Sequence, residues 1–204
     1  MSRVDELAAP PSNWNLANAL TLLRVLMVPL FGWLLLSHDG DATGWRVAAF
    51  VCFLLAILTD RFDGEIARRR GLVTSFGKIA DPIADKALTG AAFVGLSMLG
   101  ELPWWVTGLV LGREVLITLV RFVVIRYGVI PASRGGKLKT LLQAVALCGY
   151  ILPFASATTW AAEVMHLAAV VVMTAAVIVT VVTGLVYLLQ AIRVRRQGSG
   201  AGVG

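Results

Sequence analysis

Long apolar runs, separated by short polar segments, divide the chain of 204 residues. A helix needs about 20 mostly apolar residues to cross the hydrocarbon core of a bilayer. We expect spanning helices over about residues 20–36, 46–69, 76–99, 103–126, 138–157 and 162–193. The pattern therefore predicts an all-α integral membrane protein, built as a six-transmembrane-helix bundle.

The two ends of the chain are more polar than this bundle. We divide the chain into a polar lead over residues 1–14, a membrane domain over residues 15–193, and a flexible tail over residues 194–204. Trp14 precedes the first span, and tryptophan favours the depth of the lipid head groups. We therefore expect a short N-terminal interfacial helix over residues 13–18. We expect no cleavable signal peptide, because the lead is polar and carries few basic residues.

The overall composition agrees with a membrane protein and excludes an ordinary soluble domain. The chain is 58% hydrophobic and 15% charged, and its mean hydropathy is +0.81. Soluble domains are about 45–50% apolar and about 25% charged. The two cysteines, Cys52 and Cys148, lie in apolar runs without a Cys-x-x-Cys spacing. We expect them to pack as small hydrophobic residues.

Positive charge separates between the two sides of the predicted bundle. One side carries Arg68, Arg69, Arg70, Lys78, Arg126, Arg134, Lys137, Lys139, Arg193, Arg195 and Arg196. The opposite loops, over residues 37–44, 100–102 and 156–163, contain no lysine or arginine. By the positive-inside rule, both termini face the cytoplasm and the protein lies in the cell membrane. The net charge of +6 suits contact with anionic membrane lipid, and we expect no nucleic-acid partner.

Four aspartates interrupt this apolar pattern. They form the string Asp60-x-x-Asp63-Gly64-x-x-Ala67-Arg68, then eight residues, then Gly77-x-x-x-Asp81-x-x-x-Asp85. An acid costs on the order of 2.5–3.5 kcal/mol at the centre of a bilayer, so acids in spans are functional candidates. Helical spacing places each pair on one face of its helix. The turn between the two helices makes them antiparallel neighbours, so the four carboxylates can converge.

Four close carboxylates repel one another unless a cation neutralises them. The two histidines, His38 and His166, are expected on the opposite side of the membrane from the acidic string, so its ligands would be oxygen atoms alone. Ligation by oxygen alone favours Mg²⁺ or Mn²⁺ over zinc. Two ions about 3.5–4 Å apart can clamp the attacking and leaving oxygens of a phosphoryl displacement. Helix capping or ion pairs would need fewer acids. The acidic string therefore predicts a site with two metal ions.

The complete string resembles the signature of the CDP-alcohol phosphotransferase family, membrane enzymes of phospholipid synthesis. The likeness extends over about residues 15–146. It includes Asn18-Ala-Leu-Thr21-Leu-Leu-Arg24, Asp81-Pro82-Ile-Ala-Asp85-Lys86, Arg113-Glu114, Arg121 and Gly136-Lys137-Leu-Lys139-Thr140. These segments resemble the branch that uses glycerol 3-phosphate. The resemblance implies six transmembrane helices, a cytoplasmic polar cavity and a homodimer.

The resemblance also implies roles for individual residues. Asp60, Asp63 and Asp81 resemble metal ligands, and Asp85 resembles a general base that also contacts one metal. The positions that resemble contacts to the CDP head group are Gly64, Arg68 and Thr74, with Asn18 and Thr21 assisting. An acceptor phosphate needs cations, and the candidates are Arg113, Arg121, Lys137 and Lys139. Snorkelling toward the interface is an alternative explanation for Arg121.

The implied reaction transfers the phosphatidyl group of CDP-diacylglycerol to sn-glycerol 3-phosphate, giving phosphatidylglycerophosphate and CMP. The same chemistry with another acceptor stays open: phosphatidylglycerol, as in cardiolipin synthases, an inositol phosphate, or serine. A cation transporter is the alternative from another class. Transporters often show paired helix breaks near the membrane midplane, whereas these acids lie near the cytoplasmic ends of their spans. A purely structural subunit would leave the four acids unexplained.

Overall fold

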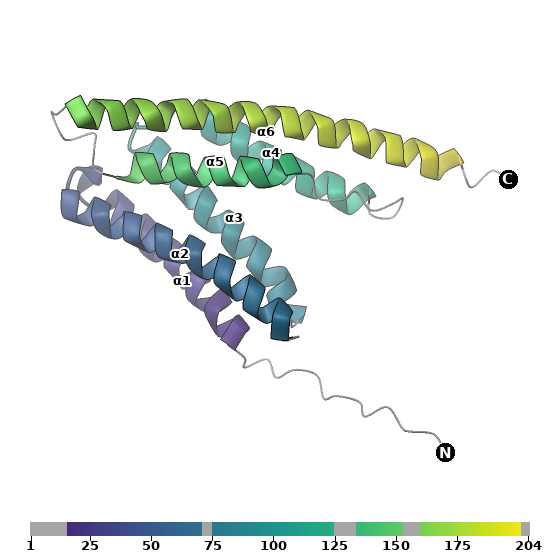
Figure 1. Ribbon diagram of the computed structural model, residues 1–204, viewed down its shortest axis with the longest axis horizontal. Helices are drawn as coiled ribbons and strands as arrows, with labels where there is room; N and C mark the ends of the chain where they lie inside the picture. The colour runs from purple at the N-terminus through teal and green to yellow at the C-terminus, as the bar shows by residue number, and fades with distance from the viewer. Residues whose placement is uncertain (1–15, 71–74, 125–133, 153–159, 201–204) are drawn as a thin grey trace, which may run out of the picture.

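The computed structural model describes residues 16–70, 75–124, 134–152 and 160–200, and within them the side chains of residues 22–59, 86–124, 135–152 and 160–194. These residues form α1 (Leu16–Leu36), the short 3-10 helix η1 (Ser37–Gly40), α2 (Thr43–Arg70), α3 (Ser75–Met98), α4 (Trp104–Val124), α5 (Arg134–Ile151) and α6 (Trp160–Gly200). Successive α-helices run back and forth (Figure 1). The predicted all-α class is confirmed.

The helices pack as two groups of three. Helix α1 packs against α2 and α3, and α6 packs against α4 and α5. The groups meet where α3 contacts α4 and α5, and where α2 contacts α5. The two groups diverge toward the side where α2 ends and α3 begins (Figure 1). The C-terminal ends of α4 and α6 point to that same side, which is the side predicted to carry the basic residues.

Some helix ends differ from those that the apolar runs predict. Helix α5 ends at Ile151, not near residue 157. Pro153 explains this, because proline lacks an N–H group and disfavours helical backbone in the residue before it. Helix α6 continues to Gly200, so its backbone stays helical well into the predicted tail over residues 194–204. No proline interrupts that segment, and its arginines and glutamine favour helix.

The predicted interfacial helix does not appear as a separate element in the described residues. Residues 16–18 belong to the first turn of α1, which continues without a break to Leu36. No glycine or proline precedes Pro29 in this helix, so nothing in the sequence ends it early. Residues 13–15, which form the rest of that prediction, lie outside the described part of the chain.

Large apolar side chains cover much of the surface. Phe122 is 72% exposed and Trp160 is 78% exposed, whereas a separate core buries Phe31, Phe53 and Phe93 completely. An apolar surface of this extent marks contact with lipid or protein rather than water. Among the described residues, two helices are long and apolar enough to cross a membrane, over Leu22–Gly40 and Trp160–Val194. Within the same described residues, α2 and α3 carry shorter apolar stretches, over Thr43–Thr59 and Lys86–Met98.

A buried arginine joins three segments at the end of the bundle opposite the acidic string. Arg46 is 2% exposed. It donates to both carboxylate oxygens of Glu101 at 2.6 and 2.8 Å, and to the carbonyls of Tyr150 and Ile151 at 2.6 and 3.0 Å. Gly40, with a φ of +77°, leaves room for it, because an added Cβ would lie 3.2 Å from Nη1. This clamp ties α2 and the α3–α4 connection to the end of α5.

Candidate active site

The acidic string occupies the end of α2 and the beginning of α3. At about 1.5 Å per residue, Asp60 and Asp63 lie about 15 and 10 Å before the end of α2. By the same rise, Asp81 and Asp85 lie about 9 and 15 Å after the start of α3. Only residues 71–74 separate the two helices. The two pairs therefore lie at similar distances along their helices from this short connection.

The side chains of the string lie outside the part of the chain whose side chains are described. This holds for Asp60, Asp63, Gly64, Arg68, Asp81 and Asp85, and also for Asn18 and Thr21 of α1; Thr74 lies outside the described residues altogether. Among the side chains that are described, no group of three or more His, Cys, Asp or Glu residues could hold a metal ion. The predicted metal ligands are therefore not tested by the geometry.

A cavity of about 440 Å³ lies between α3, α4 and α5, next to this string. Its polar lining consists of Lys86 and Thr89 from α3, Glu114 and Thr118 from α4, and Lys139, Thr140 and Gln143 from α5. Gly90 of α3 and valine and leucine side chains of α4 line the rest. Lys86 directly follows Asp85, and Thr89 lies one helical turn after it. The cavity is thus continuous with the α3 segment that carries Asp85.

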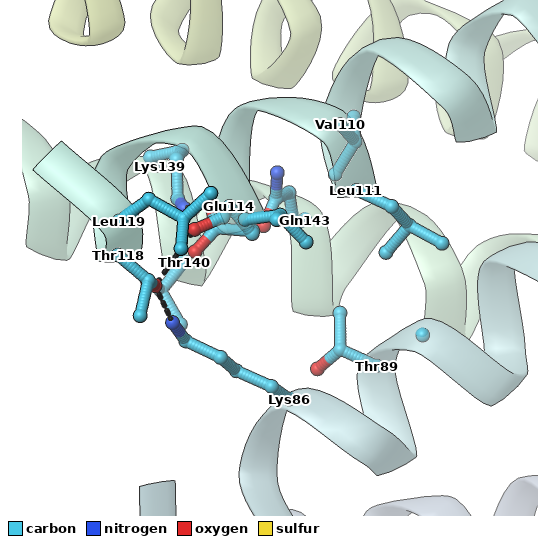
Figure 2. A pocket seen from close by; sticks show the side chains of 12 residues that line it. Lys86, Thr89, Val110, Leu111, Glu114, Thr118, Leu119, Lys139, Thr140 and Gln143 are labelled. Carbon is cyan, nitrogen blue, oxygen red and sulfur yellow. Dashed lines mark hydrogen bonds and ion pairs between the residues drawn. The ribbon is translucent and has the colours of Figure 1, made fainter. Parts of the chain in front are cut away.

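An ion cluster of Arg113, Glu114 and Lys139 stands at the polar side of the cavity; Figure 2 shows Glu114 and Lys139. Oε1 of Glu114 accepts hydrogen bonds from Nη1 of Arg113, at 2.9 Å, and from Nζ of Lys139. Lys139 is only 5% exposed, and a lysine is rarely buried so far unless it is paired. Two cations share one carboxylate, so the cluster carries a net charge of +1 beside the cavity.

Further polar contacts connect the helices around the cavity. Lys86 reaches across it and donates to Oγ1 of Thr118 at 2.6 Å (Figure 2). Gln143, which also lines the cavity, donates to Oγ1 of the fully buried Thr180 of α6, at 3.1 Å. Hydroxyl and amide partners of this kind hold neighbouring helices together in an apolar environment. Polar contacts therefore link α3 to α4, and α5 to α6.

The structure brings together two of the four predicted acceptor cations, Arg113 and Lys139, through Glu114. Arg121 and Lys137 are exposed and do not line the cavity. Sequence reasoning did not single out Thr118 or Gln143. Each lies four residues after a charged residue of the cluster, so helical spacing could have found them.

The same reasoning missed Thr180 and Thr183 of α6. Thr183 accepts a hydrogen bond from Nη2 of Arg113 at 3.2 Å. Helix α6 is apolar on nearly all sides in this region, so no periodicity in the sequence marks one face of it. These threonines can be recognised only from the packing.

Comparison with known protein families gives a match over most of the chain. A sequence model of CDP-alcohol phosphatidyltransferases matches residues 14–182. The chain belongs to this family. The matched range holds all four aspartates, the cavity and its ion cluster. Family membership and the two long apolar helices indicate an integral membrane protein, and the family identifies the chain as a CDP-alcohol phosphatidyltransferase.

Several bacterial relatives cover most of the chain. A probable phosphatidylglycerophosphate synthase of Mycobacterium tuberculosis (strain H37Rv) is 54% identical over 179 residues, which are 88% of this chain and 82% of the relative. The CDP-diacylglycerol–glycerol-3-phosphate 3-phosphatidyltransferase of Bacillus subtilis is 33% identical over 169 residues, 73% of this chain and 88% of the relative. The Escherichia coli (strain K12) protein of that name is 36% identical over 140 residues, which are 66% of this chain and 75% of the relative.

Proposed function

We propose that this enzyme transfers the phosphatidyl group of CDP-diacylglycerol to sn-glycerol 3-phosphate, giving phosphatidylglycerophosphate and CMP. The observation that carries the proposal is the 54% identity, over 88% of the chain, to a relative named as a probable phosphatidylglycerophosphate synthase. The complete acidic string on α2 and α3 supports the same chemistry.

The four aspartates fit a site for two Mg²⁺ or Mn²⁺ ions. Their pairs lie at similar distances from the connection between two successive helices, and they offer only the oxygen ligands that these ions prefer. Asp60, Asp63 and Asp81 would hold the ions, with a further contact from Asp85. When bound, the ions would stabilise negative charge on the diphosphate of the donor.

Asp85 would act as the general base. Its carboxylate takes the proton from the 1-hydroxyl of glycerol 3-phosphate. The hydroxyl oxygen forms a bond to the lipid-side phosphorus of CDP-diacylglycerol, the bond from that phosphorus to the CMP oxygen breaks, and CMP leaves with the electron pair. No ATP is needed, because the diphosphate of the donor is already activated. We expect Gly64, Arg68 and Thr74 to contact the CDP head group, together with Asn18 and Thr21.

The acceptor phosphate would bind in the cavity beside Asp85. Lys139 lines this cavity within a cluster of net charge +1, and Lys86 adds a second cation from α3. Hydrogen bonds from ammonium groups to a phosphate are stronger than neutral ones. The exposed Arg121 and Lys137 lie toward the basic ends of α4 and α5, where they would attract the anionic acceptor before it binds.

The arrangement in the membrane is also part of this proposal. All six helices would cross the cell membrane, with both termini and the acidic string on the cytoplasmic side, and the enzyme would form a homodimer. The separation of basic and uncharged loops supports this orientation. Labelling of single cysteines placed at residues 41 and 200, in intact cells, checks the orientation, and light scattering of the purified protein checks the dimer.

The reaction itself is tested with purified protein, CDP-diacylglycerol and a panel of acceptors, with the lipid product identified by mass. Glycerol 3-phosphate should give phosphatidylglycerophosphate and an equal amount of CMP. Phosphatidylglycerol, an inositol phosphate and serine serve as competing acceptors in parallel reactions. A product with one of these, and none with glycerol 3-phosphate, would overturn the proposed acceptor while keeping the family chemistry.

A further inference from the structure

Helix α6 contacts the ion cluster through two adjacent residues, Thr183 and Gly184. Arg113 extends from α4 toward α6, where its Nη2 donates to Oγ1 of Thr183 at 3.2 Å. Its side chain passes directly over Gly184. A Cβ added there would lie 3.3 Å from Cγ and 3.4 Å from Nε of Arg113. The absence of a side chain at Gly184 therefore allows this close approach.

The hydroxyl of Thr183 is oriented by its own helix. It lies 2.6 Å from the carbonyl oxygen of Val179, to which it donates its single proton. A hydroxyl has one proton and two lone pairs, so the lone pairs of Oγ1 are left to accept from a donor outside the helix. The guanidinium of Arg113 is that donor. The Thr183 hydroxyl is thus already oriented by its own helix to accept a hydrogen bond from Arg113.

The position of Arg113 determines the charge that the cluster presents to the cavity. Arg113 and Lys139 bond to the same oxygen, Oε1 of Glu114. With both cations in place, the net charge of the cluster is +1. If Arg113 moved away, Glu114 would pair with Lys139 alone, and the net charge beside the cavity would fall to zero. The anion-binding strength of Lys139 therefore depends on a residue that does not itself line the cavity.

We propose that Thr183 and Gly184 are positioning residues for the anionic acceptor: they hold Arg113 against Glu114, so that Lys139 keeps its positive charge available to a phosphate. The inference rests on the proposed function, since it concerns the same acceptor site. Both residues lie just beyond residue 182, where the match to the family ends. They give the last helix a role in the selection of substrate.

The test compares kcat and KM of the purified enzyme for glycerol 3-phosphate and for CDP-diacylglycerol. The loss of one hydrogen bond of ordinary net strength predicts that Thr183→Val raises the KM for glycerol 3-phosphate about three- to tenfold. The KM for CDP-diacylglycerol should stay the same. Thr183→Ser should restore the acceptor KM, and Gly184→Ala should raise it by displacing Arg113. Thr174→Val is the matched control, because the Thr174 hydroxyl bonds to Val170 of its own helix and is exposed.

The outcomes separate this inference from the proposed function. An acceptor KM that is unchanged in both Thr183→Val and Gly184→Ala overturns the inference, and so does an equal loss with both substrates, which would mark a purely structural role. If Thr183→Val does not fold, Gly184→Ala decides. If the wild-type enzyme uses a different anionic acceptor, the proposed function fails, and the same comparison with that acceptor still decides the roles of Thr183 and Gly184.

Discussion

The clamp around Arg46 predicts that Arg46→Met destabilises the bundle at the end far from the acidic string. Methionine keeps the length and apolar bulk of the side chain but removes the guanidinium. Glu101, which is 24% exposed, would lose both of its charge-assisted hydrogen bonds. The carbonyls of Tyr150 and Ile151 would each lose a donor. At this end of the bundle, apolar packing alone would then hold α2 and the loop between α3 and α4 against α5.

The magnitude follows from the burial of the pair. Removing one partner of a buried ion pair costs about 3–5 kcal/mol, and we expect the lower end because Glu101 retains partial access to solvent. In a protein of this size, 1 kcal/mol corresponds to a shift in Tm of about 2–4 °C. Arg46→Met should therefore lower the Tm by about 6–12 °C.

Thermal unfolding in detergent, followed by tryptophan fluorescence, measures this effect. Arg193→Met is the matched control, since Arg193 is exposed on α6. A second replacement, Glu101→Met, should cost much less in the Arg46→Met background than in the wild type, because the two residues act as a pair. A Tm for Arg46→Met equal to that of Arg193→Met would refute the reasoning, as would additive effects of the two replacements at the clamp.

Three further predictions concern the reaction and the packing. Asp85→Asn should lower kcat about 10²- to 10⁴-fold, the usual contribution of a general base; near wild-type activity would contradict that role. Removal of divalent metal with EDTA should abolish CMP release, and Mg²⁺ or Mn²⁺ but not Ca²⁺ should restore it. The reason is that the site is expected to need small ions with short metal–oxygen distances. Full activity in EDTA would contradict the metal site. Gly149→Ala should lower the Tm, since its Cβ would lie 2.8 Å from the Cβ of Ala169 and overpacking costs about 1–3 kcal/mol. Gly112→Ala, which meets no atom within 4 Å, should not lower it.

The number and order of the helices could be predicted from the sequence because each apolar run is long enough to be recognised as a helix on its own. The ends of the helices were harder to predict. Pro153 ends α5 earlier than the apolar pattern suggests, and α6 continues past residue 193 through Arg195, Arg196 and Gln197, which favour helix. Helix boundaries depend on such local effects, which an average of hydropathy over many residues does not contain.

Part of the candidate site could also be predicted from the sequence, and part could not. The acidic string could be found because charged residues at helical spacing are conspicuous in an apolar chain. Lys139 and Arg113 could be named as cations, but their junction at Glu114 depends on how α4 packs against α5. The contact between Arg113 and Thr183 joins residues 70 positions apart. No pattern in the apolar α6 marks Thr183, so only the packing of α4 on α6 identifies it.

The most direct test of the central claim is the mass of the lipid formed from CDP-diacylglycerol by the purified enzyme in a mixture of all the candidate acceptors. We predict phosphatidylglycerophosphate as the product, with CMP released in equal amount and only when glycerol 3-phosphate is present. Formation of cardiolipin, or of a lipid carrying inositol phosphate or serine, in place of phosphatidylglycerophosphate would contradict the account.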